Sequence, residues 1–98
     1  MTATYAVQTD WGSGFVSSVT VKNNGSTTIN SWRVTWTWAG NQQITNAWNA
    51  TVTQSGQGVS AVNVSYDGTI APGQTVSFGF QGTYSGTNAA PTLSASGS

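Results

Sequence analysis

The sequence predicts an all-β fold: an antiparallel β-sandwich of the immunoglobulin-like or jelly-roll-like type, formed by a single domain over residues 1–98. Three observations support this prediction. Apolar and polar residues alternate with period two in several short segments, and no stretch keeps the 3.6-residue apolar period of an amphipathic helix. Turn-forming residues separate these segments at regular intervals. The chain of 98 residues is also long enough to bury a core of its own.

The N-terminal third of the chain supplies two expected strands. The first lies around Tyr5–Val7, and the second covers Phe15–Lys22. In the second, Phe15, Val19 and Val21 line one face, and polar side chains alternate with them on the other. This pattern is typical of a strand with one buried and one solvated face.

The clearest alternation follows in Trp32–Trp38, where every even position is apolar and every odd position is polar. It predicts a half-buried strand whose odd-numbered side chains face water. Further strands are expected near Gln43–Val52 and Val59–Val64, Val76–Phe80 repeats the alternation, and a last short strand lies near Thr92–Ala95. Turn signals fall at Asn24-Gly25, Ala39-Gly40-Asn41, Ser55-Gly56, Asp67-Gly68, Pro72-Gly73 and Ser85-Gly86. The order in which the strands pair does not follow from the pattern.

The composition excludes several classes of function. The chain has five tryptophans, two basic and two acidic residues, and neither histidine nor cysteine. Nucleic acids require clustered Lys and Arg that displace counterions, anionic membrane surfaces attract basic segments, and no apolar run approaches the roughly 18 residues of a membrane span. We therefore expect no nucleic-acid or membrane partner, no catalytic residue, no metal and no cofactor. Aromatic faces and amide groups suit a neutral, hydroxyl-rich surface such as a polysaccharide.

Most aromatic rings fall on the apolar faces of expected strands. Seven are assigned to the core on this basis: Tyr5, Phe15, Trp32, Trp36, Trp38, Phe78 and Phe80. The rings left over are Trp11, Trp48, Tyr66 and Tyr84. Trp11 lies beside a charge and near two glycines, which indicates a turn, yet it is in phase with Tyr5 and Val7. The pattern therefore leaves its burial open.

The other unassigned rings are equally instructive. Trp48 shares parity with the apolar Ile44, which favours burial, and also with the polar Asn46, which does not, so its place stays open as well. Tyr66 directly precedes a turn and is expected at the surface, because turns run over the outside of a domain. Tyr84 is a further loop ring with no stronger claim to exposure.

Five blocks of the chain, in order and over nearly its whole length, resemble the family 2 carbohydrate-binding modules of bacterial cellulases and xylanases. Val19-Thr20-Val21-Lys22-Asn23 is similar to the family's second strand, Ser31–Trp36 to its GWxVxW/F strand, Gln43–Asn49 to its QxVTQxWN segment, Tyr66–Gly73 to its WNGxIxPG loop, and Phe78–Thr92 to its FGFxGxxxGxNxAPT end. The family binds its ligand through three coplanar aromatic rings on one sheet face. By this resemblance the ligand-binding rings are Trp11, Trp48 and Tyr66, and the polar residues beside them are Asn23, Asn46 and Gln81.

The resemblance also separates ligand classes. In the xylan-binding branch an arginine follows three residues after the first aromatic, and the third aromatic is missing. Here Gly14 stands at that position and Tyr66 is present, which implies the branch that binds crystalline cellulose. Two departures remain: the family usually has tryptophan where this chain has Tyr66, and members commonly join their ends by a disulfide, whereas Thr2 stands where the first cysteine would be.

The function implied by the resemblance is non-catalytic binding of crystalline cellulose, which holds an attached glycoside hydrolase on the insoluble polysaccharide. Chitin and xylan are alternative ligands. We expect a monomer tethered to a catalytic domain in a secreted, extracellular parent protein. No secretory signal follows Met1, so we interpret Met1 as an initiator placed before an excised domain.

Two other function classes stay open at this point. A glycosidase needs two carboxylates, and Asp10 and Asp67 each stand beside a candidate ring. We favour the interpretation that both are turn residues. A protein-interaction module is the other alternative, since sandwich domains of this size are used in that way.

Overall fold

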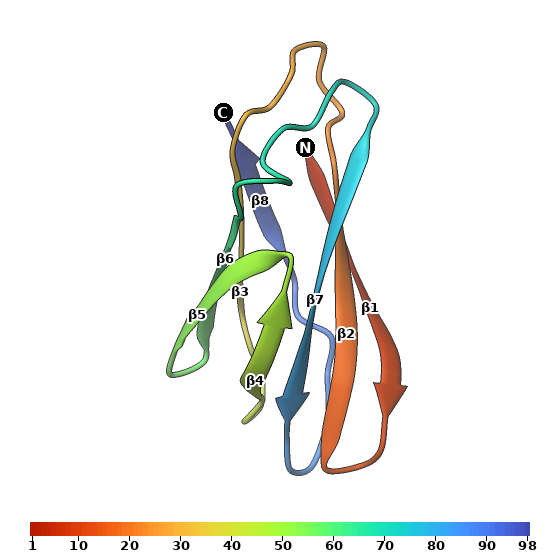
Figure 1. Ribbon diagram of the computed structural model, residues 1–98. Coiled ribbons are helices and arrows are strands. Elements are labelled where there is room, and N and C mark those ends of the chain that lie inside the picture. The colour runs from red at the N-terminus through yellow and green to blue at the C-terminus, as the bar shows by residue number, and fades with distance from the viewer.

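The computed structural model describes residues 1–98 and contains eight strands in two antiparallel four-stranded sheets that pack face to face (Figure 1). The front sheet has the order β1-β2-β7-β4, with β1 at Thr2–Asp10, β2 at Gly14–Lys22, β7 at Thr75–Thr83 and β4 at Gln43–Trp48. The back sheet has the order β5-β6-β3-β8, with β5 at Ala50–Ser55, β6 at Gly58–Asn63, β3 at Trp32–Thr37 and β8 at Ser94–Gly97. The predicted all-β antiparallel sandwich is confirmed. No helix is present that is long and apolar enough to cross a membrane.

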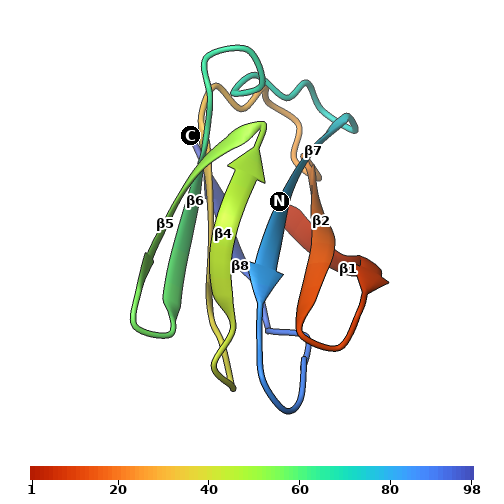
Figure 2. The same cartoon turned by 60° about the horizontal axis from the view of Figure 1, so that its bottom comes forward.

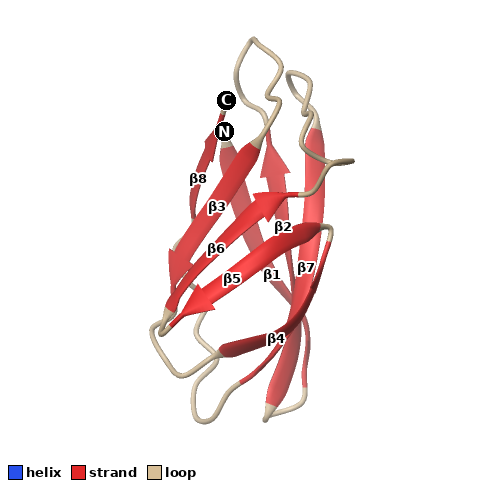
Figure 3. Cartoon of the chain, turned by 60° about the vertical axis from the view of Figure 1, so that its left-hand side comes forward, coloured by secondary structure: helices blue, strands red, loops and turns tan.

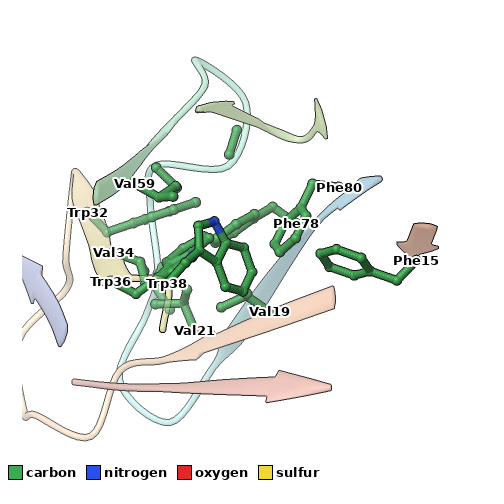
Figure 4. Packing of buried hydrophobic residues seen from close by; sticks show 13 residues of the cluster. Phe15, Val19, Val21, Trp32, Val34, Trp36, Trp38, Val59, Phe78 and Phe80 are labelled. Atoms are coloured by element: carbon green, nitrogen blue, oxygen red, sulfur yellow. The ribbon is translucent and has the colours of Figure 1, made fainter. Parts of the chain in front are cut away.

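The core lies between the sheets, where large flat rings from the two layers rest on one another (Figure 4). Trp32 stacks on Phe78 with ring centroids 5.4 Å apart, and Trp36 stacks on Phe80 at 5.6 Å. All seven rings that the period-two pattern assigned to the core lie in it or against it, with Tyr5 half-buried at its margin. The alternation in β2, β3 and β7 thus identifies the buried face correctly.

One expected strand is in fact two strands in different sheets. The region Gln43–Val52 contains β4 of the front sheet and β5 of the back sheet, joined by the single residue Asn49 (Figure 3). Asn49 has φ 64, and this left-handed backbone turns the chain from one layer to the other. Figure 2 shows β4 beside β7 and β5 continuing into the neighbouring layer.

A β-bulge in β1 changes which face its last residues occupy. Val7 pairs with the buried Ser17, but Thr9 pairs with Val16, so Gln8 is an extra residue in the ladder. Since side chains alternate between faces, one extra residue reverses the phase. We call the face of the front sheet that is turned away from the back sheet its outer face. After the bulge, the odd-numbered residues Thr9 and Trp11 point to this outer face, whereas Val7 before the bulge points inward.

The same irregularity occurs in β4. Ile44 pairs with Gly82 over the core, whereas Asn46 and Trp48 pair with Gln81 and Gly79, and Thr45 is the extra residue. Gln81 lies on the outer face because its neighbour Phe80 is buried in the core. The bulge therefore turns the last part of β4 outward.

Both chain ends lie at the same end of the sandwich (Figures 1 and 3). Thr2 pairs with Lys22 at the end of β2. At the other terminus, Met1 Sδ and the side chain of Ile29 fill the space over Gly97. Since the chain has no cysteine, these non-covalent contacts close the end of the fold.

Candidate functional site

Only three aromatic side chains are strongly exposed, and they are the three that the resemblance assigns to ligand binding. Trp11 is 50% exposed, Trp48 is 40% exposed and Tyr66 is 74% exposed. Trp11 lies in the turn after β1, Trp48 ends β4, and Tyr66 lies in the loop between β6 and β7. The structure thereby decides the position of both tryptophans, which the sequence pattern had left open.

Each tryptophan lies over a glycine of the front sheet. Ring atoms Nε1, Cε2 and Cζ2 of Trp11 fill the space that a Cβ at Gly14 would need, and the same three atoms of Trp48 fill that space at Gly79. Gly79 pairs with Ser18, four residues beyond Gly14 along β2. The rise and spacing of strands place the two glycines about 14 Å apart. The two indoles are therefore held in the same way at two points of one sheet face.

Asp10 fixes the turn that carries Trp11. Its Oδ1 accepts the backbone N–H of Gly12 at 2.9 Å and the hydroxyl of Tyr84 at 2.5 Å. Its Oδ2 accepts an amide N–H of Asn88 at 3.2 Å. The hydrogen bond from Tyr84, followed by that from Gly12, lowers the pKa of Asp10 below its ordinary value, and the same bond raises the pKa of Tyr84. Both oxygens of this carboxylate therefore accept hydrogen bonds that stabilise the turn.

Asp67 anchors the loop that carries Tyr66. Its backbone carbonyl accepts Nε1–H of the buried Trp32 at 2.7 Å, and its Oδ1 accepts the N–H of Val64 at 2.9 Å. Its Oδ2 is buried without a partner, and burial raises the pKa of Asp67. The hydroxyl of Tyr66 donates to Oδ1 of Asn49 at 2.7 Å. The loop that carries this ring is therefore tied to the core through Asp67, and the ring itself is tied to Asn49 through its hydroxyl.

The expected polar residues divide into two groups. Asn46 and Gln81 are exposed and pair with each other across β4 and β7, on the same outer face as the indoles. Asn23 is 2% exposed, and its Nδ2 donates to the carbonyls of Thr27 and Ile70, each at 2.8 Å. The expectation that Asn23 lies beside the rings is corrected by this geometry. Odd-numbered residues of β2 point inward, and Asn23, which directly follows β2, points inward in the same way. Its buried amide donates hydrogen bonds to the loop carbonyls.

The two carboxylates do not form a catalytic pair. Asp10 ends β1, next to the β1–β2 turn, and Asp67 lies in the β6–β7 loop; this turn and this loop are at opposite ends of the sandwich (Figure 1). The two ends of β2 are about 26 Å apart, whereas the carboxyl groups of glycosidases stand about 5–9.5 Å apart. The structure also contains no group of three or more His, Cys, Asp or Glu side chains that could hold a metal.

A hollow on the back sheet is lined by none of the three exposed rings. It has a volume of about 790 Å³ and is lined on the back sheet by Thr35, Thr37, Thr53 and Ser60, among others.

Sequence reasoning missed three residues that build this face: Gly79, Tyr84 and Asn49. A glycine between two core phenylalanines is a readable signal, because glycine inside a strand often marks a close approach of other atoms. The hydrogen bonds of Tyr84 and Asn49 connect segments that are distant in the chain, so no local sequence pattern predicts them.

Comparison with known proteins gives these observations a context. A family model described as "Cellulose binding domain" matches residues 1–98. The chain is 53% identical over 81 residues to Chitinase C of Streptomyces lividans and 49% identical over 90 residues to Endoglucanase C of Cellvibrio japonicus. These matches cover 83% and 91% of the chain but only 13% and 12% of the two relatives. The solution structure of the chitin-binding domain of Chi18aC from Streptomyces coelicolor matches with a TM-score of 0.75 at 49% identity, covering 94% of this chain and 88% of that one.

Proposed function

This chain belongs to the cellulose-binding domain family, and from that premise we propose that it binds the flat face of crystalline cellulose without catalysing a reaction. The binding groups are Trp11, Trp48 and Tyr66, assisted by the amides of Asn46 and Gln81. The observation that carries the proposal is that these three rings, and no other aromatic side chains, are strongly exposed.

The chemistry of the ligand matches such rings. Each pyranose unit has an apolar face of C–H groups and a rim of hydroxyls, so a flat ring gains dispersion and desolvation without meeting charge. By analogy with bases stacked on aromatic side chains, each ring contributes about 1–3 kcal/mol. Three rings reach the roughly 8 kcal/mol of micromolar binding only if little entropy is lost on contact. The glycines beneath Trp11 and Trp48 support this condition, because they let each indole lie against a rigid sheet.

Chitin is the second candidate ligand. A chitinase and a chitin-binding domain are among the similar proteins, and chitin presents the same kind of apolar pyranose face. The family model and the endoglucanase relative favour cellulose. Adsorption measured side by side on the two polymers distinguishes them.

We further infer that the module serves as the targeting part of a larger secreted glycoside hydrolase. The matched relatives are named as a chitinase and an endoglucanase, and this chain corresponds to 13% and 12% of their lengths. A tether would keep the catalytic domain close to its insoluble substrate and raise its local concentration there.

Adsorption of Trp48→Ala to microcrystalline cellulose tests the proposal. The variant should keep the circular dichroism spectrum of the wild type, because Trp48 lies outside the core, and should lose at least about fivefold in affinity. Thr53→Ala, which is exposed on the back sheet, is the matched control and should adsorb like the wild type. Normal adsorption by folded Trp48→Ala would overturn the proposal. The same assay on chitin decides between the two ligands.

A further inference from the structure

Asn49 occupies a special place in the backbone. It is the single residue between β4 of the front sheet and β5 of the back sheet, and its φ of 64 lies in the left-handed region. Most side chains are strained there, while glycine, asparagine and aspartate tolerate it. The chain turns a corner at Asn49 and leaves its side chain exposed at the margin of the two sheets.

Tyr66 lies on the other connection at this margin, the loop that leads from β6 of the back sheet to β7 of the front sheet. Its ring is 74% exposed and stacks on no other aromatic ring, so packing does little to fix its orientation. The hydrogen bond from its hydroxyl to Oδ1 of Asn49, at 2.7 Å, is the one hydrogen bond that its side chain makes. Without that bond the ring is free to exchange between rotamers.

We propose that Asn49 is a positioning residue for the third ring of the binding face. Asn49 accepts a hydrogen bond from the hydroxyl of Tyr66 and so fixes the orientation of that ring relative to Trp48, the residue that directly precedes Asn49. This inference rests on the proposed function and deepens it. It also gives the tyrosine a role of its own, because the tryptophan usual at this position in the family has no hydroxyl with which to make such a bond.

The size of the effect follows from pre-organisation. A ring that spends only part of its time in the binding orientation lowers the apparent affinity by that fraction. A typical net hydrogen-bond contribution corresponds to a factor of about two to ten in the population of the held orientation. Loss of this bond should therefore weaken adsorption about two- to tenfold.

A double-mutant cycle separates positioning from other roles. Asn49→Gly keeps a residue that tolerates positive φ and removes the acceptor, and Tyr66→Phe keeps the ring and removes the donor. Each single variant should weaken adsorption to microcrystalline cellulose about two- to tenfold, and the double variant should be no weaker than the worse single one. Asn49→Asp, which retains a carboxyl oxygen as acceptor, should adsorb like the wild type.

Three results would overturn the inference. Effects that multiply in the double variant would show that the two side chains act independently, for example because the hydroxyl contacts the sugar directly. Unchanged adsorption of Asn49→Gly would show that the ring needs no such partner. Asn49→Asp weakened as much as Asn49→Gly would show that the acceptor is irrelevant. Unfolding midpoints measured in parallel show whether Asn49→Gly is folded. If it is not, Tyr66→Phe still tests the hydrogen bond, because it changes only an exposed side chain.

The failure of this inference is distinguishable from failure of the proposed function. If Trp48→Ala adsorbs like the wild type, the proposed function fails for all rings together. If Trp48→Ala loses adsorption while the Asn49 and Tyr66 variants behave additively, only the positioning role is wrong.

Discussion

Trp48 lies directly over Gly79, its partner across β4 and β7, so that one edge of the indole fills the space that a Cβ would need. The pairing of two strands thus sets both the position of the ring and the absence of a side chain beneath it. No loop has to close around the ring. This arrangement makes the outer face of the front sheet a support whose geometry is fixed before any ligand arrives.

Gly79→Ala should weaken adsorption to cellulose several-fold. The new Cβ would overlap Trp48 ring atoms, so the indole must tilt away from the sheet and lose part of a contact worth about 1–3 kcal/mol. Because the side chain that moves is exposed, the unfolding midpoint should change little. Adsorption isotherms and a red shift of tryptophan emission check the expectation. Ser77→Ala, two residues earlier on the same exposed face of β7, is the control and should leave both readouts unchanged.

Gly14→Arg should displace Trp11 and reduce adsorption to cellulose. A Cβ at this position would lie 2.5 Å from Cζ2 of Trp11, which is too close for the ring to stay where it is. In the xylan-binding branch of the family that the sequence resembles, an arginine stands at the position of Gly14, so binding of the variant to soluble xylan, measured in the same preparation, should rise relative to cellulose. Thr4→Arg, on the exposed face of β1, introduces the same charge without a ring above it. Equal losses in both variants would attribute the effect to charge rather than to ring displacement.

The stability of the fold should depend on the ionised form of Asp10. Its hydrogen bonds from Tyr84 and Gly12 place the folded-state pKa below the unfolded value of about 4. The stabilisation is therefore present above pH 4 and is lost as the pH falls through the folded-state pKa. Asp10→Asn should have a lower unfolding midpoint than the wild type at pH 7, and the difference should shrink as the pH is lowered below about 4.

Asp67 should affect the pH dependence of stability in the opposite sense to Asp10. Burial raises its folded-state pKa above the unfolded value, so stability falls as the pH rises from the unfolded-state pKa through the folded-state pKa, and above both values the charge of Asp67 opposes folding in full. Asp67→Asn should therefore differ from Asp10→Asn in sign: it should raise the midpoint at pH 7, and this advantage should fade as the pH is lowered. Thermal unfolding followed by circular dichroism at several pH values measures both. Parallel pH profiles for the two variants would contradict the assignment.

Adsorption should be almost independent of ionic strength. The chain has two basic and two acidic residues and no net charge, and the binding rings are neutral. Screening by salt acts on charged pairs and leaves dispersion and desolvation largely intact. The affinity for microcrystalline cellulose should thus be similar at low salt and in about 1 M NaCl. A steep loss would point to an electrostatic mode of binding that these residues do not provide.

The core could be predicted from the sequence because the strands that build it are regular. In Trp32–Trp38 and Val76–Phe80, period two identifies the buried rings without error. The same rule could not place Trp11, which shares parity with Tyr5 in the sequence. The bulge at Gln8 reverses the phase between them, and nothing in the local composition marks a bulge.

The burial of Trp48 could not be predicted for the same physical reason, a β-bulge that reverses the phase of its strand. Its parity with Ile44 is cancelled by the extra residue Thr45, so Ile44 faces the core while Trp48 faces outward. The switch of sheets at Asn49 was likewise hidden, because a left-handed asparagine is set by the tertiary course of the chain. Asn23 was placed wrongly since a buried amide that satisfies loop carbonyls looks, in sequence, like a surface polar residue.

The location of the two termini has a practical meaning for fused proteins. Thr2 pairs with Lys22 and Lys22 pairs with Thr75, where the loop of Tyr66 enters β7, so both ends of the chain emerge at the Tyr66 end of the molecule. Cargo attached to either terminus would hang from that end, and Trp11 would be the ring farthest from it. Amino- and carboxyl-terminal fusions should consequently behave alike, because both place their cargo nearer to Tyr66 than to Trp11.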